Sequence, residues 1–297
     1  DVSDAITIMR DGKINRTSKP SEETHDSLVE AMTGRKAGEA FPAKTPPNSP
    51  APVLEVNGLT RGVQFADISF TVGAGEIVAL AGLVGSGRSE VARAIYGADP
   101  IDSGEVKLQG SVIKISHPAT AIENGIAMIP ESRKDQGLIL DRSIRENISL
   151  PYLKKLSRLL MKRREENSMV AENFAAAGIR ALSSEMTVRS LSGGNQQKAL
   201  FARSLAGHPT LFIADEPTRG VDVGSKRAIY ELLADLAQKG MAVLVISSEL
   251  EEVVGLAHRV IVMQTGRIVT ELVGDQISES AVVSAAFSMK QREGLAS

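Results

Sequence analysis

Short apolar segments recur along the chain and alternate with segments of helical spacing. Residues 76–81, 211–214 and 241–246 are almost continuously apolar, which is typical of strands buried on both faces of a parallel sheet. Residues 88–96 and 226–239 instead carry apolar side chains at the spacing of amphipathic helices. Because buried strands alternate with helices, the chain is predicted to have an α/β fold with a mostly parallel core sheet.

Two further regions complete the predicted fold. Residues 53–56 and 67–72 have the pattern of strands, and the second alternates polar and apolar side chains. They predict an antiparallel β region ahead of the first buried strand. Residues 152–207 are mostly helical by pattern, and we therefore expect a helical subdomain at about 143–207.

The start of the chain has a pattern of its own. It predicts a strand at 6–9, a tight turn at Asp11-Gly12 and a short helix at 27–34. Five prolines follow within a short span, a composition typical of a semi-rigid linker: Pro42, Pro46, Pro47, Pro50 and Pro52. Residues 42–52 are thus the predicted linker between residues 1–41 and a domain at 53–290.

Residues near the start of the chain are similar to residues near its end. The separation is 254 residues throughout, without a gap, and three matches carry it: Ile6-Thr7-Ile8-Met9 with Val260-Ile261-Val262-Met263, Gly12-Lys13-Ile14 with Gly266-Arg267-Ile268, and Leu28-Val29 with Val282-Val283. Two unrelated hairpins can share such a pattern by chance. The other interpretation is that residues 1–41 are the tail of a preceding, related domain. Asp1 falls within this pattern, as expected of a fragment.

Composition narrows the class of protein. The chain has 297 residues, of which 42% are hydrophobic, enough for a sizeable core. The net charge of −2 and the 3% aromatic content give no sign of a nucleic-acid-binding surface. Cysteine is absent, which excludes disulfides, thiolate metal sites and cysteine nucleophiles, and the four histidines lack metal-ligand spacing. No apolar run reaches the roughly 18 residues of a membrane-spanning helix.

A glycine-rich loop follows the first buried strand. Apart from Arg88, Gly82-x-x-x-x-Gly87-Arg88-Ser89 fits the phosphate-binding loop G-x-x-x-x-G-K-[ST]. Its glycines let backbone N–H groups turn toward phosphate oxygens, and the Ser89 hydroxyl would bind Mg²⁺. Arginine keeps the charge of lysine but is longer and planar, so the usual transition-state geometry is not expected. The predicted nucleotide-binding residues are Gly82, Gly85, Ser86, Gly87, Arg88 and Ser89.

The same loop fits a second class of site. Gly82-x-x-Gly85-x-Gly87 also resembles the turn that binds dinucleotides, with Glu105 placed to bind a ribose. Two further motifs argue against that alternative.

The first of these motifs is the segment Leu191-Ser192-Gly193-Gly194-Asn195-Gln196-Gln197-Lys198. Free N–H groups, a hydroxyl and a helix N-terminus together suit a phosphate, and a plain serine N-cap is the simpler alternative. The second motif places Asp215 and Glu216 at the end of the buried strand 211–214. In that position Asp215 can hold Mg²⁺ and Glu216 can polarise an attacking water, although an acidic turn is the simpler alternative.

Together and in this order, the three motifs resemble the nucleotide-binding domain of ABC-transporter ATPases over residues 53–286. The resemblance implies that segment 191–198 is the signature motif, whose residues Ser192, Gly193, Gly194 and Gln196 complete the ATP site of a partner domain. It also implies that Asp215, Glu216, Glu131 and Ser248 hold the catalytic positions. At two of these, Glu131 replaces the usual glutamine and Ser248 replaces the usual histidine.

Finer details are similar to one group within this family. Segments 129–138 and 215–224 look like the second half of the tandem ATPases that energise monosaccharide importers of the ribose, galactose, arabinose and xylose types. That likeness implies ATP and Mg²⁺ as cofactors. It also implies three partners, namely a first ABC half, transmembrane permease subunits and, indirectly, a periplasmic sugar-binding protein. The same likeness implies that the protein is located at the cytoplasmic face of the bacterial inner membrane.

The departures at Arg88, Glu131 and Ser248 lead to a hypothesis on mechanism. The domain's own site would bind ATP with little or slow hydrolysis, while its signature motif would serve the partner half. Two alternatives remain open, namely a regulatory half that never hydrolyses nucleotide, and an ABC ATPase without a role in transport.

Overall fold

Six strands form the central sheet of the computed structural model, which describes residues 3–10, 12–33, 41–47, 51–157 and 162–288. The sheet order is β12-β11-β5-β10-β9-β8, and all neighbours are parallel except the edge pair β11 and β12. The strands are β5 (Ile77–Gly82), β8 (Ile126–Ile129), β9 (Leu211–Asp215), β10 (Ala242–Ile246), β11 (Arg259–Gln264) and β12 (Arg267–Val273). The predicted α/β fold with a mostly parallel core sheet is confirmed.

The two faces of this sheet are covered by different layers. Along β10, Val243 and Val245 pack in the core on the side of α7 (Gly193–Leu205) and α8 (Val223–Gln238). Leu244 and Ile246 pack on the opposite side with α2 (Arg88–Ile95). Since both faces are buried, the central strands are apolar at every position, which explains why they were readily predicted from the sequence.

A second, antiparallel sheet packs beside α2. Its order is β4-β3-β6-β7, and its strands are β3 (Pro52–Arg61), β4 (Phe65–Gly73), β6 (Ser103–Leu108) and β7 (Ser111–Ile113). This is the antiparallel region predicted from the sequence, with β6 and β7 in addition. Strand β3 begins at Pro52 and is longer than segment 53–56, because β6 pairs with it on its other side.

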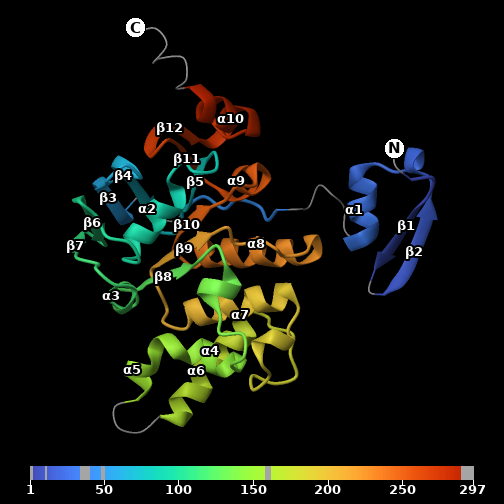
Figure 1. The fold of residues 1–297 in the computed structure, drawn as a ribbon, viewed down its shortest axis with the longest axis horizontal. Helices are drawn as coiled ribbons and strands as arrows, with labels where there is room; N and C mark the ends of the chain where they lie inside the picture. The colour runs from blue at the N-terminus through green and yellow to red at the C-terminus, as the bar shows by residue number, and fades with distance from the viewer. Residues whose placement is uncertain (1–2, 11, 34–40, 48–50, 158–161, 289–297) are drawn as a thin grey trace.

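Helices gather in the lower part of Figure 1, between β8 and β9 in the chain. They are α4 (Ile144–Ser149), α5 (Leu153–Leu156), α6 (Arg163–Ala176) and α7, and they follow α3 (Pro118–Glu123) and a π-helical turn at Arg133–Gly137. Ile144, Ile148 and Val170 join Phe201 of α7 in one core. In the described ranges, no helix is both long and apolar enough to cross a bilayer.

The similarity between the two ends of the chain is also a similarity of structure. The N-terminal elements are β1 (Ile6–Arg10), β2 (Lys13–Ser18), a 3₁₀ turn (Pro20–Glu22) and α1 (His25–Thr33). Adding 254 to these numbers reproduces β11 from its second residue, β12 over its first six residues, the 3₁₀ turn Gly274–Gln276 and α10 (Glu279–Phe287). Asp1, Asp11, Gly34, Pro50 and the domain end at 290 lie outside the described residues.

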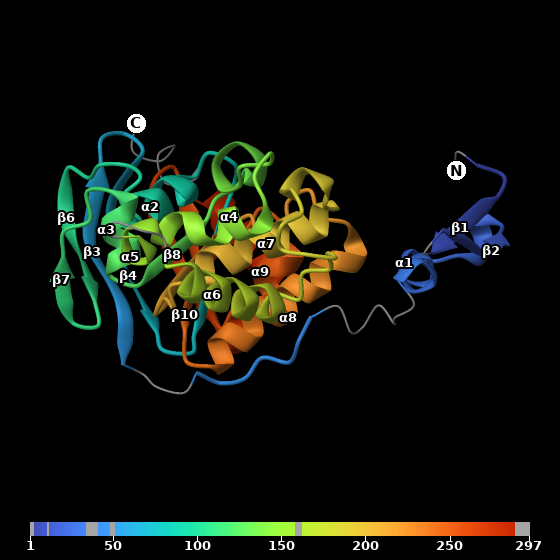
Figure 2. The same cartoon turned by 90° about the horizontal axis from the view of Figure 1, so that it is seen from below.

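The pairing within these hairpins matches as well. Ile8 pairs with Arg16 and the register then shifts, just as Val262 pairs with Thr270 before a shift in the second hairpin. Figures 1 and 2 show β1, β2 and α1 apart from the central sheet, whereas β11 and β12 belong to that sheet and α10 packs against it. The two hairpins thus share a register irregularity at equivalent positions.

Candidate nucleotide-binding site

The loop between β5 and α2 is held close to neighbouring backbone. Gly82 has a φ of +152°, and a Cβ there would lie 2.2 Å from the carbonyl oxygen of Met263. Gly87 has a φ of +97°, and its Cβ would lie 2.9 Å from the carbonyl oxygen of Gln64. Both positions therefore require glycine, because side chains disfavour this backbone region and have no space there. The loop ends at the N-terminus of α2, as an anion-binding loop does.

A buried hydroxyl in this loop has no partner of its own. Ser86 is buried, and among the described residues no group hydrogen-bonds to its Oγ. Its backbone is fully engaged, since its N–H donates to Leu83 and its carbonyl accepts from Gly266. Buried polar atoms are normally paired, so an orphaned hydroxyl inside a glycine-rich loop fits a ligand with phosphate oxygens.

Ser89 and Asp215 meet across the junction of α2 and β9. Ser89 Oγ donates to Asp215 Oδ1 at 3.0 Å. Burial raises the pKa of Asp215 to about 6, while the hydrogen bond from Ser89 lowers it, and the nearby Glu216 carboxylate raises it further. A hydroxyl and a carboxylate side by side are oxygen ligands of the kind that Mg²⁺ prefers, so these two residues fit the cation of a bound nucleotide.

The Arg88 side chain is directed to the end of β10. It is buried, and its Nη1 donates to the carbonyl oxygen of Ser247 at 2.6 Å. Burial lowers the pKa of Arg88, and the carboxylates of Glu216 and Asp215 oppose that shift. The cation of the loop is therefore held inside the protein by a backbone carbonyl and by two acidic neighbours.

Glu216 lies next to Ser248 at the ends of two adjacent strands. Ser248 Oγ donates to Glu216 Oε2 at 3.0 Å, and the N–H of Glu216 donates to the carbonyl of Ile246 at 2.8 Å. Glu216 has a φ of +47°, which is unusual for a residue with a side chain. Such local strain is often found at functional positions, and here it turns the carboxylate out of the strand beside Ser248.

Glu131 lies at a different place from these residues. It forms an ion pair with Arg219, in the turn that follows Glu216. Arg133 supports the same turn, since its guanidinium donates to the carbonyls of Arg219 and Gly220 at 2.9 and 3.1 Å. The segment around Glu131 thus contacts the turn after the strand, rather than the glycine-rich loop.

The segment 191–198 opens α7 on the opposite face of the sheet from α2. Ser192 is the N-cap residue and is exposed, and Asn195 Nδ2 donates to its Oγ at 3.1 Å. Gly194 has no space for a side chain, because a Cβ would lie 2.5 Å from Ser225 Oγ. Gln196 is buried and its amide donates to the carbonyls of Val188 and Leu191, a set of contacts that favours a structural role.

The predicted site residues therefore form two groups. The loop from Gly82 to Ser89 meets Asp215, Glu216 and Ser248 on one side of the fold. Ser192 caps α7, and Gly193, Gly194 and Gln196 lie on this helix, which occupies the helical part of Figure 1, away from α2. In the described residues, no cluster of three or more histidine or acidic side chains is placed to hold a metal by itself.

Two residues beside the site were missed by the sequence analysis. Ser247 accepts from Arg88 through its carbonyl, and Glu252 accepts a hydrogen bond from Ser247 Oγ at 2.8 Å. One feature of the sequence points to Glu252: it lies on the apolar face of α9 (Leu250–Leu256), where Val253 and Leu256 are also buried. A charged residue at such a position needs buried partners.

Comparison with known proteins finds similar sequences over nearly the whole chain. The family model described as ABC transporter matches residues 65–219. The chain is 42% identical over 286 residues to a ribose import ATP-binding protein of Geobacillus kaustophilus, covering 96% of this chain and 58% of that protein. It is 43% identical over 294 residues to a putative ribose/galactose/methyl galactoside import ATP-binding protein of Rhizobium meliloti, covering 99% and 59%. The chain thus spans less than two thirds of these relatives.

Solved structures show the same fold. A nucleotide-free ATP-binding cassette from an ABC transporter matches with a TM-score of 0.67 and 21% identity, covering 78% of this chain and 95% of that one. A dimeric cassette bound to ADP and phosphate matches with a TM-score of 0.63 and 24% identity, covering 73% and 97%.

Proposed function

Because the chain belongs to the ABC transporter family, we propose that it binds MgATP at residues 82–89 and helps to energise import of a monosaccharide. The contact between Ser89 and Asp215 carries the proposal, since it places two oxygen ligands at the end of the glycine-rich loop. The orphaned Ser86 hydroxyl supports it. Sugar import enters from the names of the relatives, which are import ATP-binding proteins for ribose or for ribose, galactose and methyl galactoside.

The residues of the site have distinct roles in this proposal. Backbone N–H groups of the loop and of the α2 N-terminus bind phosphate oxygens. Ser89 and Asp215 hold Mg²⁺, which supplies neutralising charge at the phosphates when it is bound. Glu216 accepts a hydrogen bond from the attacking water and polarises it. Ser248 holds the Glu216 carboxylate in place, as its hydrogen bond to Oε2 indicates.

The site is proposed to turn over slowly. Its cation, Arg88, donates to the Ser247 carbonyl, so this donor is already engaged by the protein. Glu131 is paired with Arg219. Ser248 is a weaker base than a histidine would be at that position. A regulatory half that binds nucleotide without hydrolysing it is the second candidate, and the engagement of Arg88 with Ser247 is the observation that favours it.

The chain is further proposed to be part of a tandem ATPase. The match of residues 6–33 to 260–287 in element bounds and pairing supports a preceding, related domain. In this proposal the segment 191–198, with exposed Ser192, serves the ATP site of that first half. The other partners are transmembrane permease subunits and, indirectly, a periplasmic sugar-binding protein. The assembly would lie at the cytoplasmic face of the bacterial inner membrane.

Nucleotide titration tests the proposal directly. Calorimetry is expected to detect binding of ATP in the presence of Mg²⁺ and no binding of NAD, in line with the family to which the chain belongs. Phosphate release is expected to stay well below about 1 s⁻¹, under the usual range for enzymes. Arg88→Lys should raise that rate several-fold, because a lysine is compact and matches the usual motif. Binding of NAD in place of ATP would contradict the proposal.

Two variants serve as references for this measurement. Arg93→Lys changes an arginine on the same helix, where it pairs with Asp99, and should leave phosphate release unchanged. Glu216→Gln identifies hydrolysis that belongs to this site. Rapid hydrolysis by the wild-type chain that Glu216→Gln abolishes would contradict slow turnover, while complete absence of hydrolysis in every variant would favour the regulatory candidate.

A further inference from the structure

A carboxylate is buried beside the proposed nucleotide site without touching it. Glu252 on α9 is 1% exposed, and three hydroxyl groups donate to it. They are Tyr230 Oη at 2.8 Å and Thr218 Oγ1 on one carboxylate oxygen, and Ser247 Oγ at 2.8 Å on the other. A buried carboxylate is tolerated only with such donors, so Glu252 fixes the positions of all three segments that provide them.

Two of the donors lie on either side of Glu216. Thr218 is two residues beyond Glu216 and begins the turn that Arg133 and Glu131 also contact. Ser247 precedes Ser248, which donates to the Glu216 carboxylate at 3.0 Å. The carbonyl of Ser247 also accepts from Arg88. One carboxylate thus holds both backbone segments that flank Glu216, and it holds the acceptor of the Arg88 guanidinium as well.

The third donor connects this carboxylate to Phe41, the residue directly before the predicted linker. Tyr230 on α8 is buried, and burial together with the Glu252 carboxylate raises the pKa of its hydroxyl, which keeps it a donor. Its ring stacks on Phe41, with ring centroids 4.7 Å apart and an interplanar angle of 22°. Gly255 allows this approach, since a Cβ there would lie 2.4 Å from the Phe41 ring. Phe41, the residue directly before the predicted linker, thus packs on a donor to Glu252.

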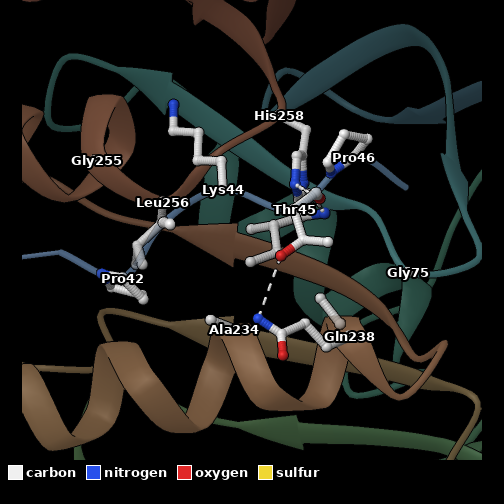
Figure 3. A pocket seen from close by; sticks show the side chains of 13 residues that line it. Pro42, Lys44, Thr45, Pro46, Gly75, Ala234, Gln238, Gly255, Leu256 and His258 are labelled. Carbon is white, nitrogen blue, oxygen red and sulfur yellow. Dashed lines mark hydrogen bonds between the residues drawn. The ribbon is translucent and has the colours of Figure 1, made fainter. Parts of the chain in front are cut away.

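The linker beyond Phe41 is fixed by further contacts. Lys44 Nζ donates to the Val254 carbonyl at 2.7 Å, and Gln238 Nε2 donates to Thr45 Oγ1 at 3.3 Å. His258 Nδ1 accepts from the Ile77 N–H, and its Nε2 lies 2.7 Å from the Thr45 carbonyl oxygen. Figure 3 shows Gln238 pointing from α8 to Thr45, with His258 on the other side of the linker. Residues 41–45 are therefore held between α8, α9 and β5.

We propose that Glu252 is a positioning residue of the nucleotide site. We further propose that Phe41, by packing on Tyr230, helps to fix this carboxylate and thereby the segments around Glu216. The inference rests on the proposed function of residues 82–89, and it adds a connection to the linker that precedes the domain. Displacing the linker changes the environment of Tyr230, which is one of the three donors. The positions of Thr218 and Ser247, and with them the support of Glu216, depend on the same carboxylate.

Hydrogen–deuterium exchange tests the proposal without requiring turnover. Glu252→Gln keeps the size of the side chain but turns one acceptor into a donor, so at least one of the three hydroxyls loses its acceptor. Amide exchange in peptides covering 216–222 and 246–250 is expected to become about tenfold faster. This is the change expected when a hydrogen bond to a charged group is lost. Tyr230→Phe, which keeps the ring stack, should have the same effect at a smaller size and serves if Glu252→Gln does not fold. Glu251→Gln, an exposed neighbour on α9, is the matched control.

The proposed connection between Phe41 and the nucleotide site is tested by the variant Phe41→Ala. Exchange is expected to rise in peptides 216–222 and 246–250, which contain neither Tyr230 nor Gly255, the two residues against which the Phe41 ring is seen to pack. A change confined to the linker and α8 would overturn the connection between linker and site. Wild-type exchange in both peptides of Glu252→Gln and of Tyr230→Phe would overturn the positioning role.

Kinetics provides a readout that loss of stability alone would not produce. In phosphate release, Glu252→Gln is expected to lower kcat about fivefold to tenfold with little change in KM, because Glu216 rather than the phosphate loop loses support. Its effect should be non-additive with Ser248→Ala, since both act on Glu216. An unchanged kcat with a raised KM would contradict the assignment. Failure of the wild-type chain to bind MgATP would contradict the proposed function alone, because the exchange result needs no nucleotide.

Discussion

Gly82→Ala is expected to lower the free energy of unfolding by about 3 kcal/mol or more, because backbone strain and overpacking each cost about 1–3 kcal/mol. A Cβ at this position would lie 2.2 Å from the Met263 carbonyl oxygen, which belongs to the neighbouring strand and has no freedom to move away. The φ of +152° adds strain for any residue with a side chain. Urea unfolding followed by circular dichroism measures the loss.

Gly85→Ala is the matched control in the same loop. Gly85 has a φ of +82°, but no heavy atom lies within 4 Å of the place that a Cβ would take, so only backbone strain is introduced. Its expected cost is about 1–2 kcal/mol. Equal losses in the two variants would mean that the contact with β11 does not decide the conformation of the loop.

Asp215→Asn is expected to stabilise the nucleotide-free protein by about 2–3 kcal/mol at pH 8. Burial raises the pKa of Asp215 from 3.8 to about 6 in the folded state. Between these two values the unfolded chain releases the proton while the folded chain keeps it, so stability falls as pH rises. This loss of stability is complete above the pKa of Asp215 in the folded state. Asparagine carries no titrating proton, so the variant does not lose this stability. The variant should also bind ATP no better with Mg²⁺ than without it.

The pH dependence separates this effect from a general change in packing. The stability difference between Asp215→Asn and wild type is expected to be small below pH 4, to grow up to about pH 6 and then to stay constant. Asp235→Asn changes an exposed residue of α8 and should stay within about 0.5 kcal/mol of wild type at every pH. A difference between Asp215→Asn and wild type that does not vary with pH would contradict the proposed cause.

Much of the central sheet could be predicted because each buried strand is recognisable from its own short apolar segment. Segments 211–214 and 241–246 are apolar at every position, and they became β9 and β10 with nearly the predicted bounds. Strands β6 and β7 were not predicted, because they lie in the outer sheet and many of their side chains face solvent. For such strands, pairing with β3 rather than the pattern decides the structure.

The candidate site was predictable in part for a similar reason. The glycine-rich loop and the residues Asp215 and Glu216 stand in contiguous motifs, so spacing alone places them at strand ends. The direction of Arg88 was not predictable, because its acceptor at Ser247 lies 159 residues away in the chain. Glu252 and its hydroxyl donors are likewise separated by 34, 22 and 5 residues, and only folding brings them together.

The two copies of the hairpin-and-helix unit differ in how much apolar surface they bury. Met9 is 56% exposed, whereas Met263, its equivalent, is fully buried. Met32 is 53% exposed, while its equivalent Ala286 is 3% exposed. The N-terminal copy therefore lacks most of the burial that stabilises the other. A single melting temperature is therefore expected to report mainly on residues 41–47 and 51–288, which include the docked segment 41–45, rather than on the N-terminal copy.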